Sequence, residues 1–293
     1  MADKGAGRQI AILAGNGDLP LLLARAARQT GHEPVIFAIA GEADIANFAG
    51  FTAHEHRWGE IGGLLKLIRG AGCTQAVFIG GIDRRPDFKA IRPDFGGLAL
   101  LPRILKLLRQ GDDGVLSQAA EMLAEKGVAL VGPLAVAPEL ALPEGLVAGA
   151  NPHKDLGDDI ERAAEAARAI GKLDIGQAAV AVDGRVVALE GAEGTDSLLE
   201  RVAQLRIAGR IADSGGVLVK CMKPTQDSRL DLPCIGPQTA AAAQRAGLDG
   251  VAGEAGRALL AGRQETIAAF AESGLFLLGL PHAPDPDGAG RDV

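Results

Sequence analysis

The feature that most constrains the fold is an alternation, through the first half of the chain, of short apolar runs with segments of helical periodicity. The apolar runs, each typical of a buried strand, cover residues 9–14, 34–40, 75–79 and 128–131. The helical segments between them cover about 19–30, 59–70, 98–109 and 113–126. Strands that alternate with helices of about 10–15 residues are typical of βαβ units. We therefore predict a Rossmann-like α/β domain with a doubly wound parallel sheet over residues 1–132.

The pattern changes after residue 132. Residues 133–152 hold four prolines and no long periodicity, which favours a linker. Two apolar runs between residues 178 and 189 are separated only by Asp183-Gly184, a strong hairpin signal. Helical and strand-like segments continue to residue 280, so we predict a C-terminal mixed α/β domain over 153–280. The segment 281–293 is rich in Pro, Gly and Asp, and we expect a disordered tail there.

Composition excludes several classes of protein. Aromatic residues make up 3% of the chain and Tyr is absent, so stacking platforms for single-stranded nucleic acid are disfavoured. The 30 basic and 37 acidic residues give a net charge of −7, which opposes general binding to a polyphosphate backbone. Three scattered cysteines are too few for a disulfide framework. No stretch approaches the roughly 20 apolar residues that span a bilayer. We expect a cytoplasmic protein that binds no nucleic acid.

Two glycine-containing turns of the first half are candidates for ligand contact. One lies between the first strand and helix, where helix amides can face an anion. A dinucleotide fingerprint would need a third glycine where Pro20 stands, which disfavours NAD. The other follows the strand 75–79, and ligands of open α/β sheets sit beyond the carboxyl ends of strands. Tight turns without a ligand are the alternative. The predicted substrate contacts of these turns are Gly15, Asn16, Gly17, Asp18, Gly80 and Asp83.

Two polar segments of the second half can carry chemistry. Residues 190–196 (EGAEGTD) contain three carboxylates within seven positions, and Thr195 directly precedes the last of them, Asp196. Such a segment can wrap a hard cation, although Thr195 or Asp196 could instead cap the next helix. Residues 220–236 mix carboxylates with Lys and Arg, as phosphoryl transfer requires, because carboxylates hold Mg²⁺ and cations neutralise phosphate oxygens. A solvated surface loop is the alternative for this segment.

Four motifs, in this order over about residues 10–280, resemble those of the LpxI family of UDP-2,3-diacylglucosamine pyrophosphatases. They are AGNGDLP (14–20), GDDGVL (111–116), LEGAEGTD (189–196) and KPTQDSRLDLPCIGPQT (223–239). The resemblance implies a lipid A biosynthesis enzyme of two domains with a ligand cleft between them. It implies hydrolysis of UDP-2,3-diacylglucosamine to UMP and 2,3-diacylglucosamine 1-phosphate (lipid X), with water attacking the sugar-side phosphorus. It also implies a divalent cation, Mg²⁺ or Mn²⁺.

The resemblance matches Asp227 to the family's essential acidic residue, and spacing and chemistry extend the site around it. We expect Asp227 and Lys223 to be catalytic, and Asp227, Glu193 and Asp196 to hold the metal. The further substrate contacts that we expect in the second half are Thr195, Lys220, Gln226 and Thr239. Asp231 is assigned to the same site.

Several questions about partners and function stay open at this point. The helix over 98–109 could lie on the cytoplasmic face of the inner membrane, as a peripheral contact, or pack in the core. A homo-oligomer is compatible with the sequence. Two rival functions are a nicotinamide-dependent oxidoreductase and a non-catalytic nucleotide-lipid carrier.

Overall fold

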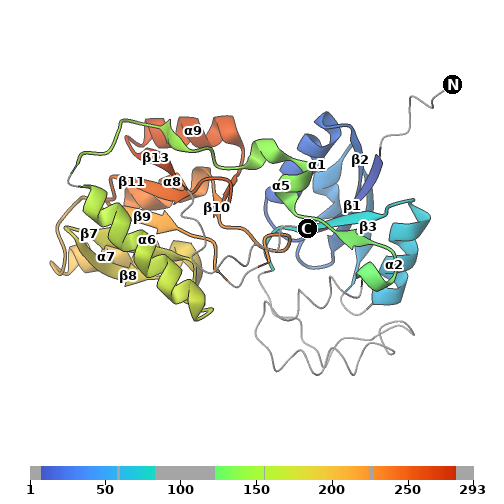
Figure 1. Ribbon diagram of the computed structural model, residues 1–293, viewed down its shortest axis with the longest axis horizontal. Helices are drawn as coiled ribbons and strands as arrows, with labels where there is room; N and C mark the ends of the chain where they lie inside the picture. Colours follow the sequence, from blue (N-terminus) through green and yellow to red (C-terminus); the bar gives the residue numbers. More distant parts are fainter. Residues whose placement is uncertain (1–7, 58–59, 83–122, 155, 225–226, 282–293) are drawn as a thin grey trace. The chain divides into compact units, whose positions relative to one another are not determined.

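The computed structural model describes residues 8–57, 60–82, 123–154, 156–224 and 227–281, which form two compact units (Figure 1). Unit 1 comprises Met1–Leu140 and Gln226–Asp231, and unit 2 comprises Ala141–Thr225 and Leu232–Val293. The chain passes from unit 1 to unit 2 after Leu140, inside the segment predicted as a linker. One short segment of the second half, Gln226–Asp231, belongs to unit 1. The predicted helix 98–109, most of the helix 113–126, and tail residues 282–293 lie outside the described residues.

Unit 1 is built on a parallel sheet with the strand order β3-β2-β1-β4-β5 (Figure 1). The order reverses beside β1, as in a doubly wound sheet, which confirms the predicted Rossmann-like fold. Strands β1 and β2 are buried along most of their length, as expected for strands covered on both faces. The described strands of unit 1 are β1 (Arg8–Ala14), β2 (His32–Ile39), β3 (Thr52–His56), β4 (Gln75–Ile79) and β5 (Ala129–Leu130). Its described helices are α1 (Leu19–Gln29), α2 (Ile61–Gly70), α5 (Pro133–Val136) and the 3₁₀ turns η1 (Ile45–Phe48) and η2 (Pro138–Leu140).

Unit 2 is built on a mixed sheet with the strand order β6-β13-β11-β9-β7-β8. Strands β9, β11 and β13 are parallel, and β6, β7 and β8 are added antiparallel at the two sides. The described strands of this sheet are β6 (Gly145–Ala148), β7 (Ala178–Val182), β8 (Arg185–Leu189), β9 (Val217–Lys220), β11 (Gly250–Glu254) and β13 (Phe276–Leu280). A separate pair consists of β10 (Cys234–Ile235) and β12 (Leu259–Leu260). This mixed α/β architecture confirms the prediction for the second half.

Helices cover both faces of the sheet in unit 2. The helix α6 (Leu156–Lys172) packs alanines against small side chains of one face. The helices α7 (Gly194–Ile207), α8 (Pro237–Arg245) and α9 (Arg263–Glu272) pack on the other face, where the core is richer in Leu and Val. The predicted hairpin is confirmed, because Asp183 (φ 51°) and Gly184 (φ 71°) form its turn in the left-handed conformation. None of the described helices is long and apolar enough to cross a membrane.

Strand β11 lies in the middle of the sheet, yet its sequence, GVAGE, does not suggest a strand. A Cβ on Gly250 would clash with the ring of Phe276 in the neighbouring strand. A Cβ on Gly253 would come within 3.0 Å of Ile235 and Leu142. The glycines therefore make room for large neighbours, at the expense of the β-branched pattern by which a strand is usually predicted.

Candidate functional site

The two glycine-containing turns of unit 1 pair with each other at the carboxyl ends of β1 and β4. The main-chain N–H of Asn16 donates to the carbonyl of Gly81 (2.8 Å), and the N–H of Gly81 donates back (3.2 Å). A Cβ on Gly15 would clash with the carbonyl oxygen of Gly81. Gly80 has a φ of 101°, and a Cβ on Gly80 would lie only 2.7 Å from the carbonyl oxygen of Asn16. Gly15, Asn16 and Gly80 thus lie close together, and close packing of two backbones accounts for both glycines. Their role as substrate contacts stays a prediction.

Two more of the predicted residues of these turns, Gly17 and Asp18, lie just before α1. Gly17 has a φ of 83° and is exposed, and Asp18 is the exposed N-cap residue of α1. Its side chain forms no capping hydrogen bond. Asp83 lies outside the described residues.

The middle of the KPTQDSRLDLP motif, Gln226–Asp231, belongs to unit 1, where Leu230 anchors it. This side chain is 9% exposed and joins the hydrophobic cluster built by β1, β2, β4 and β5. The main-chain oxygen of Ser228 lies 3.3 Å from where a Cβ on Gly132, just after β5, would stand. Strand β5 is parallel to the others, so Asp227 and its neighbours lie beside the chain that leaves the carboxyl end of the sheet.

Asp227 is held ionised by Arg229. The Arg229 guanidinium donates to both carboxylate oxygens, from Nε (2.9 and 3.1 Å) and from Nη2 (2.6 Å), and its main-chain N–H donates to Oδ1 (3.0 Å). These hydrogen bonds lower the pKa of Asp227 below its ordinary value. The Asp227 side chain is 21% exposed, so its negative charge is accessible. Gln226, the preceding residue, lies outside the described part of the chain.

In unit 2, Lys220 ends β9 as a buried cation. It is 7% exposed, and its Nζ donates to the carbonyl oxygen of Cys234 (3.0 Å). Among the described residues no carboxylate forms an ion pair with it. Burying a charge without an opposite charge is costly, so a position like this favours a bound anion.

Lys223 lies on the same segment, three residues beyond β9. Its Nζ donates to Asp174 Oδ1 (2.7 Å), and its side chain is 17% exposed. A Cβ on Gly171, near the end of α6, would lie 3.3 Å from Lys223 Cα and from Pro224. The end of α6 therefore packs directly against the start of the motif.

A buried carboxylate that sequence reasoning missed holds the chain between these two lysines. Glu254, 4% exposed at the end of β11, forms an ion pair with Arg168 of α6 (2.9 Å) and accepts the Met222 N–H (3.2 Å). The Cys221 thiol donates to the main-chain carbonyl of Ala164 (3.8 Å), and burial, together with the charge of Glu254, raises the pKa of Cys221 to about 12. A lone acid closing the small-residue run GVAGE is the only sequence signal that could have pointed to it.

The carboxylates of residues 190–196 have separate roles. Glu190 is buried and accepts from the Gln177 N–H (2.7 Å) and from the Thr195 hydroxyl (2.6 Å). Glu193, at the N-cap of α7, pairs with Arg201 (2.8 Å). Asp196 is exposed in the first turn of α7. The Thr195 hydroxyl is therefore committed to positioning Glu190.

Two further predicted residues have local roles or partners in the structure. Thr239 lies at the third position of α8, where its hydroxyl accepts the N–H of Gly236 (3.3 Å) and so caps the helix. Asp231 is exposed, and its N–H lies 3.4 Å from the Asp227 carbonyl.

The described residues contain no group of three His, Cys, Asp or Glu side chains arranged to hold a metal ion. Asp227 belongs to unit 1, whereas Glu193 and Asp196 belong to unit 2, so neither unit by itself assembles the predicted ligand set. Asp227 is an ionised and partly exposed carboxylate, the kind of group that Mg²⁺ binds, and both of its oxygens accept from Arg229 in this structure. The roles of Glu193 and Asp196 as metal ligands stay predictions.

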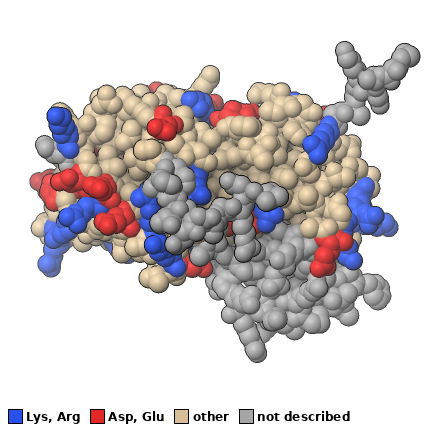
Figure 2. Space-filling model, viewed as in Figure 1, with Lys and Arg blue, Asp and Glu red and all other residues tan. Residues whose placement is uncertain are grey.

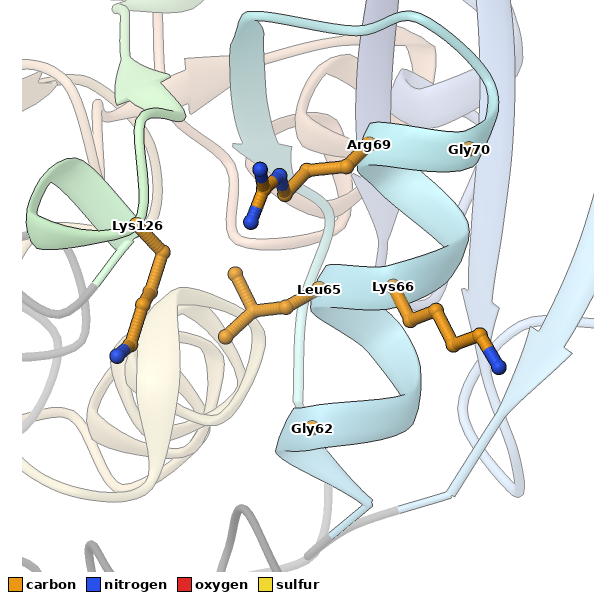
Figure 3. Close-up of a pocket in the computed structure, with 6 residues that line it drawn as sticks. All are labelled: Gly62, Leu65, Lys66, Arg69, Gly70 and Lys126. Atoms are coloured by element: carbon orange, nitrogen blue, oxygen red, sulfur yellow. The ribbon is translucent and has the colours of Figure 1, made fainter.

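Unit 1 also has a basic pocket of about 490 Å³ on α2 (Figure 3). Arg69 reaches from α2 toward the segment that carries Lys126, whereas the side chains of Lys126 and Lys66 point away from Arg69. No predicted site residue lines this pocket. On the face of the molecule in Figure 2, charges of both signs are scattered among wide uncharged areas, without a continuous basic surface across the described residues.

Comparisons with known proteins cover both units. The model of the LpxI N-terminal domain matches residues 9–140, and that of the LpxI C-terminal domain matches residues 143–278. A curated protein of Caulobacter vibrioides, described as UDP-2,3-diacylglucosamine pyrophosphatase LpxI, is 40% identical over 275 residues. The match covers 93% of this chain and 98% of that protein.

Proposed function

The chain belongs to the LpxI family, and from that premise we propose that it hydrolyses the pyrophosphate bond of UDP-2,3-diacylglucosamine in lipid A biosynthesis. The structural observation that carries the proposal is Lys220, a buried cation without a carboxylate partner among the described residues. It stands three residues before the motif that contains Asp227. A pyrophosphate supplies the missing negative charge, and a neutral ligand does not.

We assign the following roles within the reaction. Lys220 binds a phosphate oxygen and stabilises the negative charge that develops as the anhydride breaks. Lys223 adds a second cation, since its pairing with Asp174 leaves it partly exposed. Asp227, ionised by Arg229, orients the attacking water or binds a divalent cation. Mg²⁺ or Mn²⁺ bound there would neutralise charge on the pyrophosphate. We propose attack at the sugar-side phosphorus, which yields UMP and lipid X.

The first experiment is hydrolysis of UDP-2,3-diacylglucosamine in ¹⁸O-water, with Mg²⁺ or with EDTA, followed by mass spectrometry. We expect UMP and lipid X only when metal is present, with the label in lipid X. Label in UMP would place the attack at the other phosphorus. Binding of the substrate without any cleavage would contradict the enzyme proposal and favour a carrier.

A pair of variants tests the assignment of Lys220. Lys220→Met replaces the ammonium by an apolar group of similar length, so we expect the protein to fold and kcat/KM to fall at least about 100-fold, as when one charge-stabilising donor is lost. Lys66→Met is the control, because Lys66 is exposed on α2 in unit 1. Comparable kcat/KM for the two variants would show that Lys220 does not contact the phosphate. Asp227→Ala should lose most turnover and still bind substrate.

A further inference from the structure

The turn after α6 exposes two large aliphatic side chains close together. Leu173 is 71% exposed and Ile175 is 50% exposed, on either side of Asp174. Single exposed apolar residues are common on protein surfaces and need no explanation. Here, however, two exposed apolar residues share one three-residue turn, and the neighbours of that turn suggest a function.

The backbone of this turn is held in one conformation. The N–H groups of Leu173 and Ile175 both donate to the carbonyl of Ile170 (3.1 Å each). Asp174 has a φ of 54°, a left-handed conformation that is uncommon for a residue with a side chain. Its carboxylate accepts from Lys223 Nζ (2.7 Å). The aliphatic pair is therefore fixed to a lysine of the family motif.

The turn also precedes the strand that pairs with the end of β9, where Lys220 lies. After the turn the chain enters β7, whose first residue, Ala178, is paired with Lys220 at the end of β9. Unit 2 thus has a buried cation, a partly exposed lysine and an exposed aliphatic pair near the end of β9 and the start of β7. An amphipathic ligand with an anionic group and hydrocarbon chains matches this combination of charge and apolar surface.

We propose that Leu173 and Ile175 bind the hydrocarbon of an acyl chain of the lipid substrate while Lys220 binds its pyrophosphate. The inference rests on the proposed function, because the substrate named there carries two acyl groups on its glucosamine. Contact with hydrocarbon removes the two side chains from water, which favours long acyl chains over short ones.

The test is the double variant Leu173→Ser/Ile175→Ser, assayed with two substrates in detergent micelles. One is UDP-2,3-diacylglucosamine with long acyl chains, and the other is the same molecule with two acetyl groups. We expect kcat/KM for the long-chain substrate to fall about 10- to 100-fold, from the apolar burial lost at two side chains, while kcat/KM for the diacetyl substrate is unchanged.

The matched control is Ile207→Ser. Ile207 is 87% exposed at the last residue of α7, and the first turn of that helix is the end that adjoins Glu190. A helix of 14 residues is roughly 20 Å long, so Ile207 lies far from the start of β7 and the end of β9. We expect the control to retain wild-type kcat/KM with both substrates.

Other outcomes would overturn the inference. An equal loss with both substrates would mean that the turn supports the site and does not bind the chain, and no loss would mean that it binds nothing in the reaction. A variant that keeps kcat/KM in micelles but loses binding to phospholipid vesicles would assign the turn to the bilayer surface. Absence of wild-type hydrolysis would instead refute the proposed function.

Discussion

Leu230 should control whether the motif segment stays docked on unit 1. Replacing Leu230 by Ala removes three carbon groups, each contributing about 0.8 kcal/mol when buried. Because Leu230 is only 9% exposed, nearly all of that contribution is lost, and we expect about 2–3 kcal/mol less docking free energy. The loss falls on Gln226–Asp231, since this segment enters unit 1 separately from the rest of the second half.

The assay is hydrogen–deuterium exchange of the segment together with turnover. The N–H of Leu230 donates to the Asp227 carbonyl (2.9 Å), so its exchange reports on local opening. A loss of 2–3 kcal/mol corresponds to exchange that is about 30- to 150-fold faster. Turnover should fall as well, because Asp227 is carried by the same segment.

Leu67→Ala is the control for this prediction. Leu67 lies on α2 in the same unit and is 42% exposed, so the same truncation there removes little buried surface. If Leu230→Ala matched this control in both exchange and turnover, anchoring by Leu230 would be refuted.

Three further predictions concern charge, backbone conformation and thiol reactivity. Because Arg229 lowers the pKa of Asp227, the stability from that pairing is complete above the unfolded pKa of about 3.8 and is lost as the pH falls through the folded pKa. Arg229→Met should therefore lower the urea midpoint at pH 7 and weaken its acid dependence, and an unchanged pH profile would contradict this. Gly80→Ala should cost about 2–4 kcal/mol in urea unfolding, because φ is 101° and a main-chain oxygen lies 2.7 Å from the new Cβ. Gly17→Ala, with a φ of 83° and open space, should cost only about 1–2 kcal/mol, so equal costs would show that the close contact is unimportant. Burial raises the pKa of Cys221 to about 12, so iodoacetamide at pH 8 should label this thiol only when the protein is unfolded in urea. Peptide mass mapping measures the labelling, and a labelled Cys221 in the native protein would contradict the prediction.

Local patterns predicted most of the fold correctly. The alternation of strands and helices in the first half and the Asp183-Gly184 hairpin both depend on residues close in sequence. Strand β11 was missed for the opposite reason. Its glycines accommodate Phe276 and Ile235, which come from distant parts of the chain, and no local pattern reports such a neighbour.

The residues of the candidate site also differ in how well the sequence predicted them. The mixture of charges after a strand singled out residues 220–236, including Lys220 and Lys223, and the resemblance to the family added the role of Asp227. The sequence grouped Glu190 with possible cation ligands, whereas the structure satisfies both of its oxygens with protein donors. It overlooked Glu254, whose partners lie more than 30 positions away in sequence.

The two α/β architectures and the motif that marks the family could be predicted from the sequence alone, because periodicity, turn chemistry and motif order are local properties. Two other features became visible only in the folded chain. Leu230 anchors its segment in unit 1, and Lys220 is buried without a carboxylate partner among the described residues. Burial and pairing of a side chain depend on which distant segments pack around it. Those contacts form only when the whole chain folds, and for this reason they leave no local pattern in the sequence.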